Sequence, residues 1–272
     1  EDGAVFISID ESEQPNLRML CDEIFGAENF VADFVWAAGR KNDSKHTSVS
    51  HEYIVAYVRS LQHLKDKGLL WRTRKEGLDD IYGAFERLKR VLGDNHAELQ
   101  AGLRQWFSGL ADTDPAKKLR HYSCVDARGI YFPDNISWPG GGGPKYEVVH
   151  PLTGKACAVP SRGWLFAKPE RMATAIADGR VHFGPDETQV PCLKSYLRDR
   201  ELDVPYSVFY QDGRASTKRL RDLMGDDVFE NPKDETVLAK IIEFAGDRTG
   251  IVLDFFAGSG TAAHAVLGLN SS

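Results

Sequence analysis

Hydrophobic positions in the first sixty residues predict strands around one helix. The β-branched run Ala4–Ile9 predicts a strand, and the apolar positions within Leu17–Phe25 recur at the spacing of one helix face, with Gly26 ending that helix. Two further strands are predicted at 30–36 and 53–58. Strands and a helix in this order are typical of an α/β sheet.

The central part of the chain has a different pattern. A helical period from Leu61 to about Leu119 predicts a helical insertion, and residues 120–165 combine turns with short aromatic runs. The glycine run Pro139–Pro144 predicts a flexible loop and no phosphate cradle, because no Lys-Ser/Thr pair follows it and no helix opens from it. Two short helices are predicted next, at Pro169–Ala177 and Thr217–Met224.

The last fifty residues return to an α/β order. Thr236–Ala245 has the apolar period of a helix, Ile251–Asp254 predicts a buried strand, and Thr261–Leu269 predicts a second helix. The chain therefore has α/β segments at both ends and a mixed region between them.

The composition allows a sizeable hydrophobic core and excludes some classes of protein. The chain has 272 residues, 42% of them hydrophobic, and no run approaches the 18 apolar residues of a membrane helix. Its first residues lack the basic start and apolar length of a signal peptide. The four cysteines lie far apart without a CxxC pair, and no histidines at ligand spacing accompany them. We expect a cytoplasmic protein with no membrane role and no metal site.

The charge is unevenly distributed. The formal net charge is −6, yet residues 36–75 carry nine bases and three acids, whereas residues 1–35 carry nine acids and one base. A basic segment in an acidic chain suits a polyanionic partner, because neutralising phosphates requires local charge. A solvated surface is the alternative explanation.

The sharpest chemical signal is the predicted strand, tight glycine turn and helix at Ile251–Thr261. Gly258 and Gly260 let backbone N–H groups approach a ligand, and the following helix N-terminus favours a carboxylate or phosphate. A carboxylate at the strand end, Asp254, suits a ligand with a cationic amine. The dinucleotide fingerprint G-x-G-x-x-G is incomplete, because Ala263 stands at the third glycine. An ordinary strand-to-helix turn is the alternative.

The pattern D-x-F-x-G-x-G-T within this turn resembles the S-adenosylmethionine motif of DNA amino-methyltransferases. Further segments are similar to the modification subunits of type III restriction-modification systems, namely 3–10, 14–18, 22–30, 42–44, 50–57 and 229–233. The chain thus resembles the β class of DNA adenine-N6 methyltransferases, in which the catalytic motif, target-recognition region and cofactor motif follow in that order. The resemblance covers about residues 1–60 and 160–270.

This resemblance implies a partial S-adenosylmethionine-dependent methyltransferase sheet, Rossmann-like and α/β, with an inserted α+β target-recognition domain. Residues 1–60 and 226–272 would form the methyltransferase core, and 61–225 the target-recognition region with its helical insertion. The implied activity is methyl transfer from S-adenosylmethionine to adenine N6 in a specific sequence of double-stranded DNA. The implied protein partners are a restriction subunit and a second modification subunit.

Two alternatives remain open. The chain could be a non-catalytic DNA-binding module, or a dinucleotide-dependent oxidoreductase, which the absent third glycine disfavours.

One element of the family is absent from the sequence. The resemblance places an Asp-Pro-Pro-Tyr-type tetrapeptide before the first strand, and no such tetrapeptide occurs here. In the family its groups accept the hydrogens of the adenine amine and stack on the flipped base. We therefore assign no catalytic residue, expect an internal fragment of a larger methyltransferase, and expect no turnover by this chain alone.

The resemblance also assigns cofactor-binding residues. A Pro-Lys step lies against the methionine part of the cofactor, and Asp234 follows it where the family usually has a proline, which brings a carboxylate to that place. The cofactor-binding residues are expected to be Asp254, Phe255, Phe256, Ala257, Gly258, Gly260, Thr261, Pro232 and Lys233.

DNA contacts are expected in two loops. Arg40, Lys41, Asn42, Ser44 and Lys45 mix charges for phosphates with amide and hydroxyl groups for base edges. Lys145 and Arg162, near Trp138 and the glycine run, form a second candidate group. Solvated loops are the alternative. His51-Glu52 resembles an acid-base pair, but adjacent strand residues point to opposite faces, so we interpret it as structural.

Overall fold

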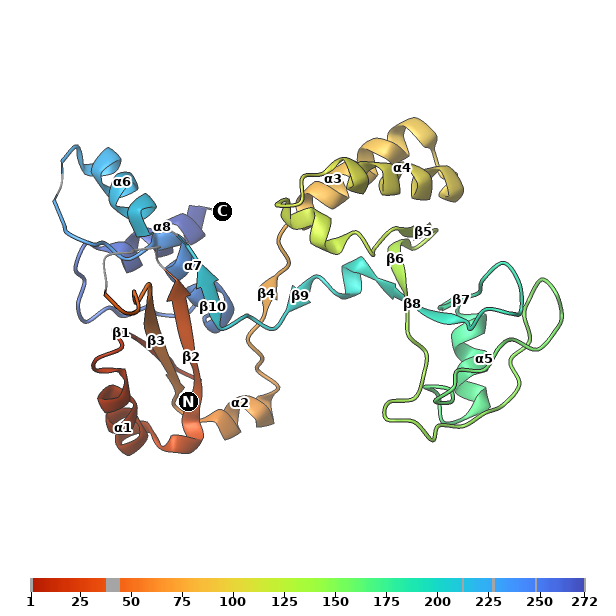
Figure 1. Ribbon diagram of the computed structural model, residues 1–272, viewed down its shortest axis with the longest axis horizontal. Helices are drawn as coiled ribbons and strands as arrows, with labels where there is room; N and C mark the ends of the chain where they lie inside the picture. Colours follow the sequence, from red (N-terminus) through yellow and green to blue (C-terminus); the bar gives the residue numbers. More distant parts are fainter. Residues whose placement is uncertain (1, 38–44, 212, 227, 248, 272) are drawn as a thin grey trace. The chain divides into compact units, whose positions relative to one another are not determined.

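The computed structural model describes residues 2–37, 45–211, 213–226, 228–247 and 249–271 (Figure 1). The chain divides into two compact units, Glu1–Thr73 with Leu202–Ser272 (unit 1) and Arg74–Glu201 (unit 2). The chain passes from unit 1 to unit 2 within β4 (Thr73–Arg74) and returns to unit 1 just before β9 (Leu202–Asp203). The fold is mixed α/β with several sheets, as the sequence predicts. The boundaries 60/61 and 225/226 of the expected target-recognition region remain a prediction.

Unit 1 holds a four-stranded sheet in the order β1-β3-β2-β10. It consists of β1 (Ala4–Ile9), β2 (Phe30–Ala37), β3 (His51–Val58) and β10 (Val208–Tyr210). β3 runs antiparallel to β1 and β2, and β10 runs parallel to β2. The three strands predicted in the first sixty residues are confirmed.

Helices cover both faces of this sheet, because alternate strand residues point to opposite sides. α7 (Glu235–Ala245) packs its Ile241 and Phe244 against Phe34 and Ile54 on one face. α1 (Gln14–Phe25) packs Cys21 against Val55 and Tyr57 on the other. Gly26, at a φ of 87°, ends α1 as predicted.

The other helices among the described residues of unit 1 are η1 (Ala27–Asn29), α2 (Leu61–Lys67), α6 (Gly213–Met224) and α8 (Thr261–Ser271). The predicted helices at 217–224, 236–245 and 261–269 are therefore confirmed, with ends shifted by a few residues. No helix in the described ranges is long and apolar enough to cross a membrane.

The buried strand predicted at Ile251–Asp254 is wrong. These residues form no strand, and Ile251 and Leu253 are 96% and 70% exposed. The strand preference of Ile, Val and Leu reflects packing on a pleated surface more than an intrinsic backbone preference. Among the described strands, none pairs with this run, so its apolar pattern alone does not produce a strand.

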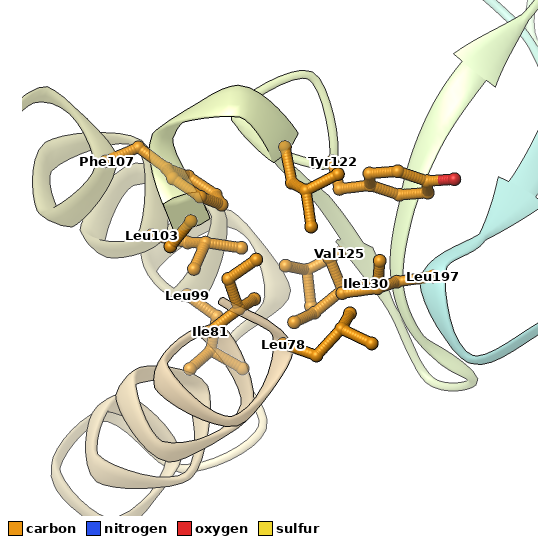
Figure 2. Close-up of a cluster of buried hydrophobic side chains, with 11 residues drawn as sticks. Leu78, Ile81, Leu99, Leu103, Phe107, Tyr122, Val125, Ile130 and Leu197 are labelled. Atoms are coloured by element: carbon orange, nitrogen blue, oxygen red, sulfur yellow. The ribbon is translucent and has the colours of Figure 1, made fainter. Parts of the chain in front are cut away.

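Unit 2 joins helices to a second sheet. α3 (Leu78–Leu92), α4 (His96–Gly109) and η2 (Pro115–Leu119) form the predicted helical stretch, although α2, within its predicted range, belongs to unit 1. Their buried side chains, including Ile81, Leu103 and Phe107, meet Val125 and Ile130 of the sheet in one core (Figure 2).

The antiparallel sheet of unit 2 has the order β5-β6-β8-β7. Its strands are β5 (Cys124–Asp126), β6 (Gly129–Asp134), β7 (Val181–His182) and β8 (Cys192–Tyr196). α5 (Pro169–Ala177) and η3 (Leu197–Asp199) complete the unit, and α5 has the predicted bounds. A separate cluster around Trp164, which is fully buried, packs on α5 through Met172.

Candidate functional site

The Pro-Lys step lies at the edge of the unit 1 sheet where the parallel strands β2 and β10 end. Ligands of α/β sheets bind outside the carboxyl ends of such strands. At this edge Trp36 of β2 stands directly opposite Glu52 of β3 in the ladder. Trp36 is buried, and its Nε1 donates to the Gln211 carbonyl oxygen at 3.0 Å.

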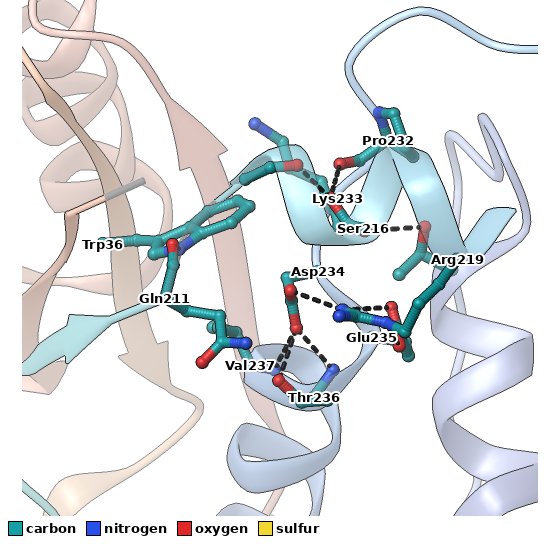
Figure 3. A network of polar contacts seen from close by, with 12 residues as sticks. Trp36, Gln211, Ser216, Arg219, Pro232, Lys233, Asp234, Glu235, Thr236 and Val237 are labelled. Carbon is teal, nitrogen blue, oxygen red and sulfur yellow. Dashed lines mark hydrogen bonds and ion pairs between the residues drawn. The ribbon is translucent and has the colours of Figure 1, made fainter. Parts of the chain in front are cut away.

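Asp234 caps α7 and is fully buried. Its Oδ1 accepts from the backbone N–H groups of Thr236 at 2.8 Å and Val237 at 3.3 Å, as an N-cap residue does. Its Oδ2 accepts from Arg219 Nη2 of α6 at 2.7 Å (Figure 3). Arg219 also pairs with Glu235. The Asp234 carboxylate, which stands where the resemblance implies a proline, is thus bound by groups of the protein itself.

The electrostatics of Asp234 follow from these contacts. Burial alone raises the pKa of a carboxyl, but the hydrogen bonds from Thr236 and Arg219 outweigh it and hold the pKa of Asp234 below its ordinary value of 3.8. Asp234 is therefore ionised at neutral pH, with Arg219 as its counter-ion.

Lys233 is fixed by its backbone neighbours and by its own ammonium. The Pro232 carbonyl oxygen accepts from Ser216 Oγ at 3.0 Å (Figure 3). The Lys233 ammonium forms an ion pair with Glu52 and lies 5.6 Å from the centre of the Trp36 ring. A cation at that distance over an aromatic face is attracted by the ring.

The glycine turn adopts the backbone that only glycine takes easily. Gly258 and Gly260 have φ angles of 52° and 73°. The Gly260 N–H donates to the Ala257 carbonyl oxygen at 2.6 Å, and the Asp254 carboxylate accepts from the Phe256 N–H at 3.1 Å. A Cβ at Gly260 would meet nothing within 4 Å, so the turn offers open backbone to a ligand.

The turn and the Pro-Lys step lie together. Thr261 Oγ1, at the start of α8, donates to the Lys233 carbonyl oxygen at 3.4 Å. Two of the expected cofactor-binding side chains do not pack into this place, because Phe255 and Phe256 are 77% and 93% exposed. Open glycine backbone, the N-terminus of α8 and the exposed Asp254 carboxylate are hydrogen-bonding groups that fit the polar groups of S-adenosylmethionine.

The expected DNA-contact residues fall in different places. Arg40, Lys41, Asn42 and Ser44 lie outside the described residues, whereas Lys45 is described and exposed. Lys145 and Arg162 in unit 2 are exposed and lie on adjacent segments, since the Gly143 N–H donates to the Arg162 carbonyl oxygen at 2.9 Å. The structure thus brings the second candidate group together.

The glycine run beside that group is more constrained than its composition suggests. A Cβ at Gly143 would lie 2.3 Å from Trp138 Cβ, and one at Gly163 would lie 2.3 Å from the Gly143 backbone. Gly140, Gly141 and Gly142 have open space instead. One end of the predicted flexible loop is therefore packed against the segment that carries Arg162.

Sequence reasoning did not predict the ion pairs of Glu52 and Arg219. We interpreted His51-Glu52 as structural, although the two-residue period already places Glu52 on the face of Ile54 and Ala56, which α7 covers. No local pattern marks Arg219, because its partners lie 15 and 16 residues further along the chain. No group of three or more His, Cys, Asp or Glu side chains suited to a metal ion occurs among the residues the structure places.

Comparison with known proteins identifies the family. Residues 1–272 match the family model described as DNA methylase, for N6/N4 methyltransferases. The chain is 35% identical over 276 residues to the EcoP15I Mod subunit, a type III restriction-modification enzyme of Escherichia coli, covering 100% of this chain and 41% of that protein. It is 32% identical to the StyLTI Mod subunit of Salmonella typhimurium, covering 98% of this chain and 35% of that protein.

A type II enzyme is also similar: the methyltransferase M.KpnI of Klebsiella pneumoniae is 26% identical, with 99% of this chain and 59% of that protein covered. The chain spans about two fifths of the length of the type III relatives it matches. A match of the family model along the whole chain leaves one conclusion: the chain belongs to the DNA methylase family of N6/N4 methyltransferases.

Proposed function

We propose that this chain is part of the modification subunit of a restriction-modification system and that it binds S-adenosylmethionine for methyl transfer to adenine N6 in double-stranded DNA. Unit 1 would carry the cofactor site, and unit 2 would be the inserted target-recognition domain. A restriction subunit, a second modification subunit and a cytoplasmic location belong to the same proposal. The similarity to the three type III Mod subunits supports it.

The observation that carries the cofactor assignment is the contact between Thr261 and Lys233. Two segments that the resemblance assigns separately to S-adenosylmethionine meet at the carboxyl edge of a parallel strand pair, where α/β sheets bind ligands. When bound, the cofactor supplies an electrophilic methyl group on its sulfonium. The residues of this chain hold the cofactor in position.

In the proposed DNA contacts, Lys45 would bind phosphates together with Arg40 and Lys41, and Asn42 and Ser44 would contact base edges. Lys145 and Arg162 would do so from unit 2. The exposed positions of Lys45, Lys145 and Arg162 support this assignment, since phosphate contacts need accessible cations.

Transfer of a tritiated methyl group tests the function. The polypeptide that joins this chain to an Asp-Pro-Pro-Tyr segment is incubated with labelled S-adenosylmethionine and duplex DNA, and the DNA is digested to nucleosides. We expect label in N6-methyladenine, none with Gly258→Asp, and none with the 272-residue chain alone. Label in N4-methylcytosine would overturn the adenine assignment, and transfer that survives Gly258→Asp would overturn the cofactor site.

A further inference from the structure

Glu52 lies at the proposed cofactor edge and has no part in the assignments above. It stands opposite Trp36 in the β2–β3 ladder, and its carboxylate forms an ion pair with the Lys233 ammonium. The side chains of Glu52 and Lys233 are 37% and 39% exposed. One acid and one base thus reach solvent side by side next to the Pro-Lys step.

The backbone on either side of Lys233 is held by other groups. Ser216 Oγ donates to the Pro232 carbonyl, Thr261 Oγ1 donates to the Lys233 carbonyl, and Arg219 pairs with the buried Asp234. These contacts fix where the Lys233 side chain starts. The exposed ammonium and its carboxylate partner are the groups that can exchange contacts with a ligand.

Opening this ion pair costs little. A pair exposed to this extent is screened by water and contributes little to stability. When the pair opens, the Trp36 ring still attracts the Lys233 ammonium, so the cation keeps its place.

The two charges select the kind of ligand. A purely anionic group such as a DNA phosphate is attracted by Lys233 and repelled by Glu52, and a simple cation meets the reverse. A ligand that carries an ammonium and a carboxylate on one carbon satisfies both side chains with charge-assisted hydrogen bonds.

We propose that Glu52 and Lys233 form a clamp for an amino-acid zwitterion, in which Glu52 binds the α-ammonium and Lys233 the α-carboxylate of the methionine end of S-adenosylmethionine. This inference rests on the proposed cofactor function. It assigns a ligand contact to Glu52 and a defined partner to Lys233. The glycine turn, joined to Lys233 through Thr261, lies beside the clamp.

Two ligands that differ only in the amino-acid end test the clamp. S-adenosylhomocysteine carries the zwitterion, whereas 5′-deoxy-5′-methylthioadenosine keeps the adenosine and sulfur without it. Binding of each to the full chain is followed by NMR up to millimolar ligand. We expect Glu52→Gln and Lys233→Met each to lower the affinity for S-adenosylhomocysteine by about tenfold or more. The affinity for methylthioadenosine should change by less than about twofold in either variant.

A charge swap separates recognition from folding. The double variant Glu52→Lys with Lys233→Glu keeps an attractive pair but reverses its direction. We expect it to restore the urea midpoint lost in either single charge reversal, and to leave S-adenosylhomocysteine binding weak by about tenfold or more. Recovery of ligand affinity together with stability would overturn the clamp.

The remaining outcomes separate the two proposals. If the chain binds S-adenosylhomocysteine and the Gln and Met variants leave it unchanged, or weaken both ligands equally, the clamp is wrong and the cofactor site stands. If the unaltered chain binds neither ligand saturably, the proposed cofactor function fails and the clamp fails with it.

Discussion

The Thr261 hydroxyl donates to the Lys233 carbonyl oxygen at 3.4 Å and joins two segments 28 residues apart. One segment is the glycine turn that leads into α8, and the other is the Pro-Lys step that leads into α7. Both helices begin at this contact. Ligand groups that bind at one N-terminus are therefore close to the other, which is the geometric basis of a single cofactor site.

Replacing Arg219 by alanine should destabilise unit 1. The buried Asp234 carboxylate would lose its counter-ion while keeping its N-cap bonds. Because Arg219 is 38% exposed, we expect a loss of about 1–3 kcal/mol of unfolding free energy, below the cost of breaking a fully buried pair. Urea unfolding measures it. Lys218→Ala, an exposed neighbour on α6, is the control, and equal losses in both variants would contradict the role of the pair.

The contribution of the Asp234 carboxylate to stability should decrease at low pH. Because the folded state lowers the pKa of Asp234, its ionic contribution is complete above the ordinary value of 3.8 and is lost as pH falls through the lower folded value. Asp234→Asn should therefore cost about 1–2 kcal/mol at pH 7, and the difference from the unaltered chain should shrink as pH falls below 3.8 and through the lowered folded pKa. Urea titrations at pH 7 and at a pH below 3.8 measure the difference in unfolding free energy between the two proteins. A difference that is the same at the two pH values would contradict this linkage.

The sequence predicts those elements of the fold that depend on a pattern of neighbouring residues. Period-two and helical patterns predict β1, β2, β3 and α7, because their buried faces repeat along the chain. The same apolar pattern predicts a strand at Ile251–Asp254 that does not form, since a strand also needs a neighbour to pair with.

The candidate site also has parts that the sequence predicts and parts that it does not. The glycine turn and the Pro-Lys step are local motifs and are visible in the sequence. The pairs Glu52 with Lys233 and Arg219 with Asp234 depend on tertiary contacts that no spacing rule contains. The N-cap bonds of Asp234 to Thr236 and Val237 are local, whereas its ion pair with Arg219 forms only in the fold.

Alanine at Gly260 should strain the turn. A left-handed backbone at a φ of 73° disfavours a side chain, so we expect Gly260→Ala to cost about 1–2 kcal/mol although its Cβ has open space. Gly268, inside α8, is the matched control, because alanine favours a helix interior by up to about 1 kcal/mol over glycine. Thermal or urea unfolding of both variants compares them. Similar stability in the two variants would argue against the left-handed turn.

DNA binding through unit 2 should depend on salt. Each neutralised phosphate lowers log K by about 0.9 per log unit of salt, so the double variant Lys145→Ala with Arg162→Ala should flatten the slope by up to about 1.8. Fluorescence anisotropy with a labelled duplex, begun at low salt, measures the slope. Lys89→Ala is the control within unit 2, since its ammonium already pairs with Asp94 at 3.4 Å. An unchanged slope in the double variant would remove these residues from the DNA interface.

Equilibrium dialysis with radiolabelled S-adenosylmethionine tests the central claim, that the glycine turn and the Pro-Lys step form one cofactor site. It is run on the unaltered chain, on Gly258→Asp and Lys233→Glu, and on the control Gly142→Asp, a glycine of φ 75° in the other glycine run. We predict saturable binding that falls about tenfold or more in each site variant and is unchanged in the control. Saturable binding that both site variants leave intact would contradict the claim.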